Sequence, residues 1–344
     1  MEASETTVLV TGASGFIAMH CIFQLLERGY KVRGTLREPA REAGLRKTFA
    51  KHLSADDRLE FLTADLQKEG GWDDAVERCT YVLQVASPFP RQPPKHEDDI
   101  INTARKGTLR ILKAAASGNV RRVVMTSTIA AIFKGHEHDD TKVFNEDDWA
   151  TTDQDIGDYY KSKILAERAA WDFVNNLQGD DILELAVINP GVTLGPILNE
   201  HFSTSGELIY RLMGRKIPGC PDIRWPVVDV RDVADAHIAA MIIPEAAGKR
   251  FCCAIENTRI QDIALILAKH FKGRGYNIPT RMLPNILVRF RALYNKTTRL
   301  VVKDLGRCTH ISNERIKNIL NWKPRTLEEM VVAMGESMIE QGVV

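Results

Sequence analysis

The chain has 344 residues, enough to bury a large core as one α/β domain or as a domain with an appended lobe. Its 46 basic and 45 acidic side chains give a net charge of +1, so the overall composition does not favour binding to nucleic acid or to an anionic membrane. No apolar run approaches the length of a transmembrane span. Residues 1–7 are polar and acidic, unlike a signal peptide, and we therefore expect a cytoplasmic protein.

The six cysteines, at positions 21, 79, 220, 252, 253 and 308, lack the spacing of a metal site or a disulfide framework. Free thiols in a reducing compartment are the expectation. The run 136–138 (His-Glu-His) lies in a charged stretch, for which we predict a solvated loop and no metal.

The first predicted element is a buried strand, Thr7 to Val10, which leads into the glycine-rich residues 11–18 and then a helix pattern ending near Gly29. This order of strand, turn and helix is the context of a dinucleotide site. The first glycine makes the tight turn, the second lets the backbone approach a pyrophosphate, and the helix N-terminal amides receive the negative charge. The motif predicts that cofactor-binding residues here are Gly12, Ser14, Gly15, Phe16 and Ile17.

The second predicted strand, residues 30–36, is followed at once by Arg37, with Arg41 four residues later. Guanidinium groups at this strand end suit the 2′-phosphate of NADP. Glu38 leaves NAD open as the alternative, because its carboxylate would reach the ribose hydroxyls if the strand ended one residue later. A solvated basic turn is the other interpretation. We favour NADP(H), bound by Arg37 and Arg41.

Further strands and helices alternate along the chain, with strands predicted at 59–63, 81–85, 122–125 and 182–188 and helices around 72–78 and 100–116. The alternation predicts an α/β fold, a Rossmann-type doubly wound parallel sheet. Ligands in such sheets bind beyond the carboxyl ends of the strands. The candidate cofactor-binding residues at these ends are Asp65, Leu66, Val85, Ala86, Ser87 and Thr126.

A helix that begins near Asp158 contains the most distinctive pair of side chains. Tyr159 and Lys163 lie one turn apart on the same face. A nearby ammonium favours the phenolate and is expected to lower the pKa of the tyrosine, which prepares Tyr159 for proton transfer. By itself the pair also fits a core tyrosine beside a lysine that extends to the surface.

The remainder of the chain is predicted to form a smaller lobe. We assign residues 1–195, together with roughly 225–245, to the Rossmann domain, and 196–344 mainly to the lobe, which binds the substrate. Asp229 and Asp232 are expected to be helix caps and structural ion-pair partners. Segment 282–305 combines apolar residues at helical spacing with a basic surface. A helix packed on the lobe is the expectation, with a substrate lid, an oligomer contact or a surface-lying amphipathic helix as alternatives.

Together these motifs resemble the extended short-chain dehydrogenases. Arg37, the run 85–89 and the helix 159–171 are most similar to the branch of dihydroflavonol reductase and of yeast aldehyde and methylglyoxal reductases. The resemblance implies that Tyr159 is the general acid, that Lys163 holds the nicotinamide ribose, and that Thr128 hydrogen-bonds the substrate oxygen, with Ser127 as a structural or backup hydroxyl. The residues that it implies around the nicotinamide are Pro190, Gly191, Val192, Thr193 and Ser205.

The resemblance therefore implies an NADPH-dependent reductase of aldehyde and ketone carbonyls, a monomer or homodimer with a small-molecule substrate. An NAD(P)-dependent sugar-nucleotide epimerase or dehydratase, or a hydroxysteroid dehydrogenase, is the alternative within the same superfamily. A catalytically silent NADP-binding sensor is the alternative of another class, although such a protein would be expected to lose the Tyr159 and Lys163 pair. Substrate-pocket residues are expected near Phe89, Phe133, Phe202 and 205–225.

Overall fold

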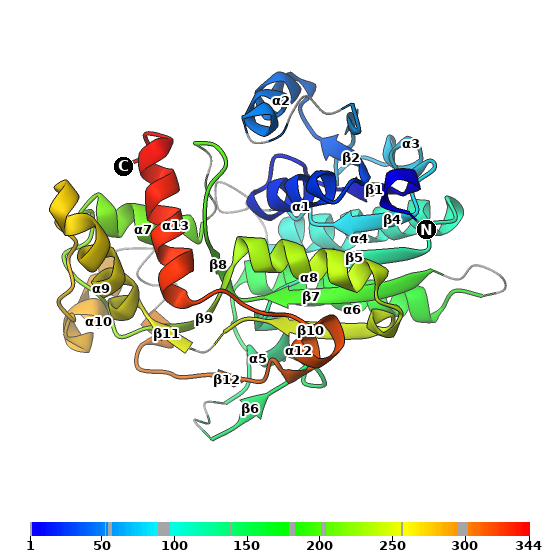
Figure 1. The fold of residues 1–344 in the computed structure, drawn as a ribbon. Coiled ribbons are helices and arrows are strands. Elements are labelled where there is room, and N and C mark those ends of the chain that lie inside the picture. The colour runs from blue at the N-terminus through cyan, green and yellow to red at the C-terminus, as the bar shows by residue number, and fades with distance from the viewer. Residues whose placement is uncertain are drawn as a thin grey trace.

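The computed structural model describes residues 2–51, 53, 57–88, 97–137, 139, 141–178, 183–200, 202, 204–255, 257–294 and 302–344. A parallel sheet of seven strands lies at the centre of the molecule (Figure 1). In spatial order its strands are β10 (Lys249–Cys253), β7 (Glu184–Pro190), β5 (Arg122–Thr126), β4 (Tyr81–Gln84), β1 (Thr7–Val10), β2 (Lys31–Leu36) and β3 (Leu59–Thr63). The strand order reverses between β1 and β4, which is where doubly wound sheets bind ligands.

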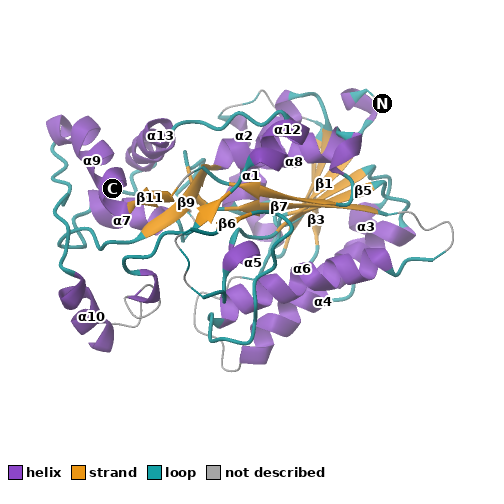
Figure 2. Ribbon diagram, turned by 90° about the horizontal axis from the view of Figure 1, so that it is seen from below, coloured by secondary structure: helices purple, strands orange, loops and turns teal. Residues whose placement is uncertain are grey.

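Helices cover both faces of this sheet, as Figure 2 shows. One face carries α1 (Phe16–Glu27), α8 (Val230–Ile242) and α12 (Glu314–Leu320), and the other carries α3 (Trp72–Val76), α4 (Glu97–Ser117) and α6 (Asp158–Asn175). Strands β4 and β5 are buried at every residue, as expected for a parallel sheet that is covered on both sides. The predicted doubly wound fold is confirmed.

The predicted strands agree with the observed ones to within one or two residues among the described positions. Residue 182, where the sequence pattern of β7 begins, lies outside the described residues. The main sheet also includes β10, which forms its edge beside β7. From the sequence, this segment was assigned to the lobe. Free cysteines Cys252 and Cys253 are fully buried in this strand.

A smaller lobe with its own hydrophobic core is formed mainly by residues that come after β7 in the chain. Its three-stranded sheet consists of β8 (Val192–Leu194), β9 (Arg224–Asp229) and β11 (Asn257–Arg259), and its helices are α7 (Gly206–Met213), α9 (Ile260–Phe271), α10 (Asn285–Tyr294) and α13 (Leu327–Glu340). Shorter elements are α2 (Glu42–Ala50), α5 (Ala130–Phe133), β6 (Val143–Phe144), β12 (His310–Ile311) and 3-10 turns at Ala3–Glu5, Pro39–Arg41, Pro244–Ala246, Lys272–Arg274 and Val302–Asp304. Strands β6 and β12 pair in parallel.

Helix α8 returns from the lobe to the main sheet and packs against α1. Asp229 caps it by accepting the N–H of Arg231 at 2.8 Å and also pairs with the Arg231 guanidinium. Asp232, fully buried, pairs with Arg325. The predicted structural roles of both aspartates are confirmed.

Helix α10 differs from the expected packed helix of the lobe. Only Val288 and Ala292 are buried on it, whereas five large apolar side chains face outward. The predicted helical spacing was correct, but the prediction that its apolar stripe packs on the lobe was wrong. Among the described residues, no helix has both the length and the hydrophobicity that crossing a bilayer requires.

Candidate active site

The glycine-rich turn between β1 and α1 is held in place by side-chain hydroxyls. Thr35 Oγ1 accepts the N–H of Gly12 at 2.9 Å, and Thr11 Oγ1 accepts the N–H groups of Val85 and Ala86 at 3.1 and 2.9 Å. Gly12 has φ of +71°, and a Cβ there would lie only 3.0 Å from that of Ala86. The turn therefore requires glycine at this position.

The N-terminus of α1 begins directly after this turn. No side chain caps it, so its first amides keep their hydrogen-bonding capacity for a ligand. Ser14, Phe16 and Ile17 are half-buried and Gly15 is exposed, whereas Ala18 is fully buried against the sheet. The uncapped backbone amides at this helix start fit the negative charge of a pyrophosphate.

Arg37 and Arg41 follow β2 at the molecular surface, with Glu38 between them. The Glu38 carboxylate lies 3.5 Å from Nη2 of Arg37 and 3.1 Å from Nε of Arg41. Its hydrogen bond with Arg41 and the charges of both guanidinium groups hold the pKa of Glu38 below its ordinary value. Glu38 is thus a partner of the two arginines in this structure. Arg41 also lines a surface cavity of about 400 Å³ together with Ser14, Lys47 and Lys51.

Asp65 and Leu66 lie just after β3. Asp65 Oδ1 accepts the N–H of Gln67 at 3.0 Å, and the Leu66 carbonyl accepts a hydrogen bond from Arg110 at 2.6 Å. Both side chains are half-buried. Ser87 is likewise half-buried beyond β4, whereas Phe89 lies outside the described residues.

Three consecutive hydroxyl residues, the last residue of β5 and the two that follow it, have different environments. Thr126 Oγ1 lies 2.6 Å from Nε2 of His237, a ring whose Nδ1 lies 2.7 Å from the Val233 carbonyl. Ser127 is buried and donates its hydroxyl to Glu167.

Thr128 is half-buried, and its Oγ1 accepts the N–H of Ala130 at 3.3 Å. Its hydroxyl proton is therefore left for another acceptor. Of the three hydroxyls, that of Thr128 is the one that fits a role in contacting substrate, while Ser127 and Thr126 are committed to buried partners.

Helix α6 carries Tyr159 and Lys163 on the same side. Lys163 is 5% exposed and donates from Nζ to the Thr126 carbonyl at 2.8 Å, which joins α6 to the end of β5. Burial lowers the pKa of Lys163 to about 8, and the nearby Glu167 carboxylate opposes this effect. Burial raises the pKa of the half-buried Tyr159 above its ordinary value. The expected lowering of the Tyr159 pKa by Lys163 is therefore not observed, because burial acts in the opposite direction.

A buried ion pair lies one turn further along α6. Glu167 is fully buried and accepts hydrogen bonds from Nε of Arg250 at 2.6 Å and from Nδ2 of Asn189 at 3.0 Å, in addition to that of Ser127. The Arg250 guanidinium stacks on Trp149 at 3.7 Å and donates to three backbone carbonyls, those of Glu146, Asp148 and Ala131.

The cluster of Glu167 and Arg250 was not predicted from the sequence. Glu167 follows Lys163 by four residues, as Lys163 follows Tyr159, so the helical spacing was the signal that would have found it. The distant partner Arg250, by contrast, has no local signal.

The chain between β7 and β8 makes a close backbone crossing. A Cβ at Gly191 would lie 2.4 Å from the Pro226 carbonyl oxygen, so only glycine fits. Asn189 Nδ2 also donates to the Thr128 carbonyl at 3.1 Å, which ties this segment to the end of β5. Val192 is half-buried and Thr193 is buried, while Ser205 precedes α7 and is half-buried.

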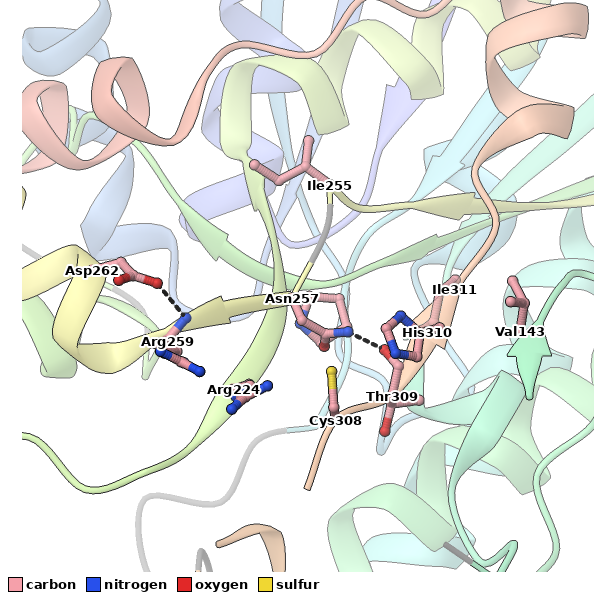
Figure 3. Close-up of a pocket in the computed structure, with 11 residues that line it drawn as sticks. Val143, Arg224, Ile255, Asn257, Arg259, Asp262, Cys308, Thr309, His310 and Ile311 are labelled. Carbon is pink, nitrogen blue, oxygen red and sulfur yellow. Dashed lines mark hydrogen bonds between the residues drawn. The ribbon is translucent and has the colours of Figure 1, made fainter. Parts of the chain in front are cut away.

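A cavity of about 460 Å³ lies on the lobe side of this crossing, between the strand pair β9–β11 and the β6–β12 pair (Figure 3). Arg224 and Arg259 face each other across the antiparallel strands, and both line the cavity with Asn257, Cys308 and His310. Buried Nε of Arg224 and Oδ1 of Asn257 have no hydrogen-bond partner in the described structure. No motif in the sequence pointed to this arrangement, because it depends on the pairing of distant strands.

Within the described ranges, no group of three His, Cys, Asp or Glu side chains lies close enough together to hold a metal ion. His138, part of the charged run noted in the sequence, lies outside those ranges.

Comparison with known proteins places this geometry in context. A model of the NAD dependent epimerase/dehydratase family matches residues 8–253. A Saccharomyces cerevisiae protein named "Putative uncharacterized oxidoreductase YDR541C" is 36% identical over 347 residues, covering 95% of this chain and 96% of the yeast protein. Cinnamoyl-CoA reductase 1 of Petunia hybrida is 34% identical, covering 89% and 88%. The crystal structure of yeast methylglyoxal/isovaleraldehyde reductase Gre2 complexed with NADPH superimposes with a TM-score of 0.81 at 28% identity, covering 98% of this chain and 100% of Gre2.

Proposed function

Because this chain belongs to the NAD dependent epimerase/dehydratase family, we propose that it is an NADPH-dependent reductase of aldehyde and ketone carbonyls. The observation that carries the proposal is the contact between Lys163 and the end of β5. It fixes helix α6, which carries Tyr159, to the last residue of β5, two positions before Thr128. The relatives named reductases, one of them crystallised with NADPH, support the same activity and cofactor.

In this proposal the bound nicotinamide supplies a hydride to the carbonyl carbon. Tyr159 donates its phenolic proton to the carbonyl oxygen, and the Thr128 hydroxyl donates a hydrogen bond to the same oxygen. Burial keeps Tyr159 protonated near neutrality, which is the form that a general acid needs for reduction. Lys163 fixes the position of this face through the Thr126 carbonyl. The product is the alcohol, which has gained one hydride and one proton.

The backbone around the glycine-rich turn supports NADPH as the cofactor. The uncapped amides of α1 fit the pyrophosphate, and Arg37 and Arg41 fit the 2′-phosphate at the adenosine end. The backbone of 190–193, with Ser205, would hold the nicotinamide side. An incoming phosphate competes with Glu38 for both guanidinium groups, so Glu38 must separate from them or share them.

The cavity beyond Gly191 supports a substrate whose far end is polar. Two facing arginines repel one another unless an anion or a hydrogen-bonding group lies between them. Asp262 also lines the cavity, but its carboxylate accepts the N–H of Arg259 at the start of α9. We expect the carbonyl end of the substrate at Tyr159 and Thr128 and a polar end toward Arg224. We also propose that residues 1–195, with roughly 225–245, form the Rossmann domain and that 196–344 mainly form the substrate lobe. The protein is proposed to act in the cytoplasm as a monomer or homodimer.

The proposal is tested by following NADPH absorbance with an aromatic aldehyde, methylglyoxal, a β-keto ester and a dihydroflavonol, with NADH in parallel. Turnover of any of them with NADPH would support the reductase and begin to rank the substrates. Silence on all four, with NADPH binding verified by fluorescence, would count against carbonyl reduction.

Replacement of Arg37 tests the coenzyme assignment. Because Arg37 and Arg41 are the guanidinium groups nearest the end of β2, Arg37→Ala is expected to raise the KM for NADPH roughly tenfold or more and to change that for NADH little. Steady-state kinetics with both coenzymes measure this ratio. Equal losses for the two would contradict the assignment of the phosphate to Arg37.

A further inference from the structure

Helix α10 exposes a continuous apolar surface. Ile286, Leu287, Phe290, Leu293 and Tyr294 are between 58% and 80% exposed. The other large apolar side chains of comparable exposure in the described chain, Val143, Ile242 and Leu265, belong to three different elements. The α10 residues therefore form a patch, which is the kind of surface that marks an interaction site.

The helical geometry orders this patch. At roughly 100° per residue, the five apolar side chains fall on an arc of about 120°. Val288 and Ala292, the two buried residues of α10, lie opposite the centre of that arc. Arg289 and Arg291 lie at its two borders, one on each side, and both are exposed. The helix thus rests on the lobe by a narrow small-residue face and presents a broad apolar face bordered by arginines.

The charge around the patch has a single sign. Between residues 281 and 294 the chain contains Arg281, Arg289 and Arg291 and no aspartate or glutamate. All three arginines are exposed, and none has an ion-pair partner among the described residues. A second copy of the chain that docked on the same patch would bring arginines against arginines. A negatively charged surface is complementary to it.

The position of α10 makes the patch accessible. Figures 1 and 2 both show α10 at the outer end of the lobe, far from the seven-stranded sheet. Val288 anchors it in the lobe core, and Lys134 on the Rossmann side pairs at 2.9 Å with Asp304, in the 3-10 turn that contacts α10. The helix therefore projects from the body while its base is fixed.

We propose that α10 is a membrane-binding helix that lies in the surface of an anionic lipid bilayer. Its apolar arc enters the boundary between headgroups and acyl chains, which is where the side chains of Phe290 and Tyr294 are favoured. Arg289 and Arg291, at the borders of the arc, reach back to the lipid phosphates. This activity is independent of the reductase function.

The test is co-sedimentation of the full chain with phosphatidylcholine vesicles and with vesicles that contain about one-third phosphatidylserine. We expect at least tenfold stronger partitioning onto the anionic vesicles and a weaker effect in high salt. The double variants Phe290→Ser/Leu293→Ser and Arg289→Gln/Arg291→Gln should each lose tenfold or more. Leu265→Ser, which removes a half-exposed leucine from α9, is the matched control and should bind like the original chain.

Circular dichroism of each variant verifies that it is folded. Absence of binding to anionic vesicles, or equal binding by the original chain and both double variants, would overturn the proposal. A dimer in solution that the Phe290→Ser/Leu293→Ser variant converts to a monomer, without vesicle binding, would likewise overturn it and assign the patch to contact between copies.

Discussion

Helices α6 and α10 are both amphipathic, and each has one face in an unfavourable environment. The unfavourable environment is the protein interior for α6 and the solvent for α10. Helix α6 turns the charged Lys163 and Glu167 into the protein, where they are at most 5% exposed. Helix α10 turns Phe290 and Tyr294 into solvent. Burial of charge and exposure of apolar surface both cost stability. Such local conflicts are expected where a protein serves a function other than its own folding.

The two helices differ in how the cost is offset. On α6, Glu167 has three hydrogen-bond partners, Arg250, Asn189 and Ser127, and Lys163 has the Thr126 carbonyl. On α10, the five large side chains of the apolar arc stay between 58% and 80% exposed in the described chain. The comparison therefore predicts that α6 is optimised within this molecule, whereas α10 is completed by contact with another surface.

The largest expected effect concerns Tyr159, at the start of α6. Tyr159→Phe removes the proton donor while it preserves the ring, so kcat should fall on the order of 10³-fold. Because the proposed pyrophosphate and 2′-phosphate sites lie at the start of α1 and after β2, NADPH binding should persist. Stopped assays with excess enzyme measure the first value and fluorescence titration the second. Turnover within tenfold of the original would exclude Tyr159 as the general acid.

Much of the structure around α6 could be predicted from the sequence, because it depends on local spacing. The glycine-rich turn, the parallel strands and the positions of Tyr159 and Lys163 follow from patterns within 10 to 20 residues. The direction of the Tyr159 pKa shift could not be predicted, since it depends on burial by other parts of the chain. The Glu167 and Arg250 pair joins residues 83 positions apart, for which a single sequence carries no signal.

For α10, only the helical structure could be predicted from the sequence. Its periodicity shows that the apolar residues share one face, but periodicity does not show which face meets the lobe. Here Val288 and Ala292 fill that role, although they are the smaller residues. The net charge of +1 gave no indication either, because acidic residues elsewhere offset the local arginines.

The next expected effect separates stability from activity on α6. Burial lowers the pKa of Lys163 to about 8, below its value of 10.5 in an unfolded chain, so folding disfavours the ammonium. At pH 7 the difference corresponds to about 3 kcal/mol of lost stability. Lys163→Met should therefore abolish turnover yet raise the free energy of unfolding by roughly 1–3 kcal/mol without cofactor.

The stability cost of the buried Lys163 depends on pH. Between pH 8 and 10.5 the unfolded chain holds a proton at Lys163 that the folded chain releases, so the original protein gains stability as pH rises. The advantage of Lys163→Met should shrink through this window. Denaturant unfolding at pH 7 and pH 10, with Lys161→Met on the same helix as the control, measures it. A variant less stable than the original at pH 7 would contradict the assigned cost of the buried charge.

The smallest expected effect concerns two residues of α10 that differ in exposure. Val288 is 6% exposed and Phe290 is 62% exposed, and the two have similar helix propensities. Val288→Ala removes two buried methyl groups and should cost about 1.5 kcal/mol of the free energy of unfolding. Phe290→Ala removes a whole ring but should change it by no more than about 0.5 kcal/mol, because that ring is largely in solvent. Urea unfolding of both variants without lipid measures the pair. A larger loss of unfolding free energy for Phe290→Ala would show that its ring packs on this chain in solution. Helix α10 would then, like α6, be stabilised by contacts within the chain.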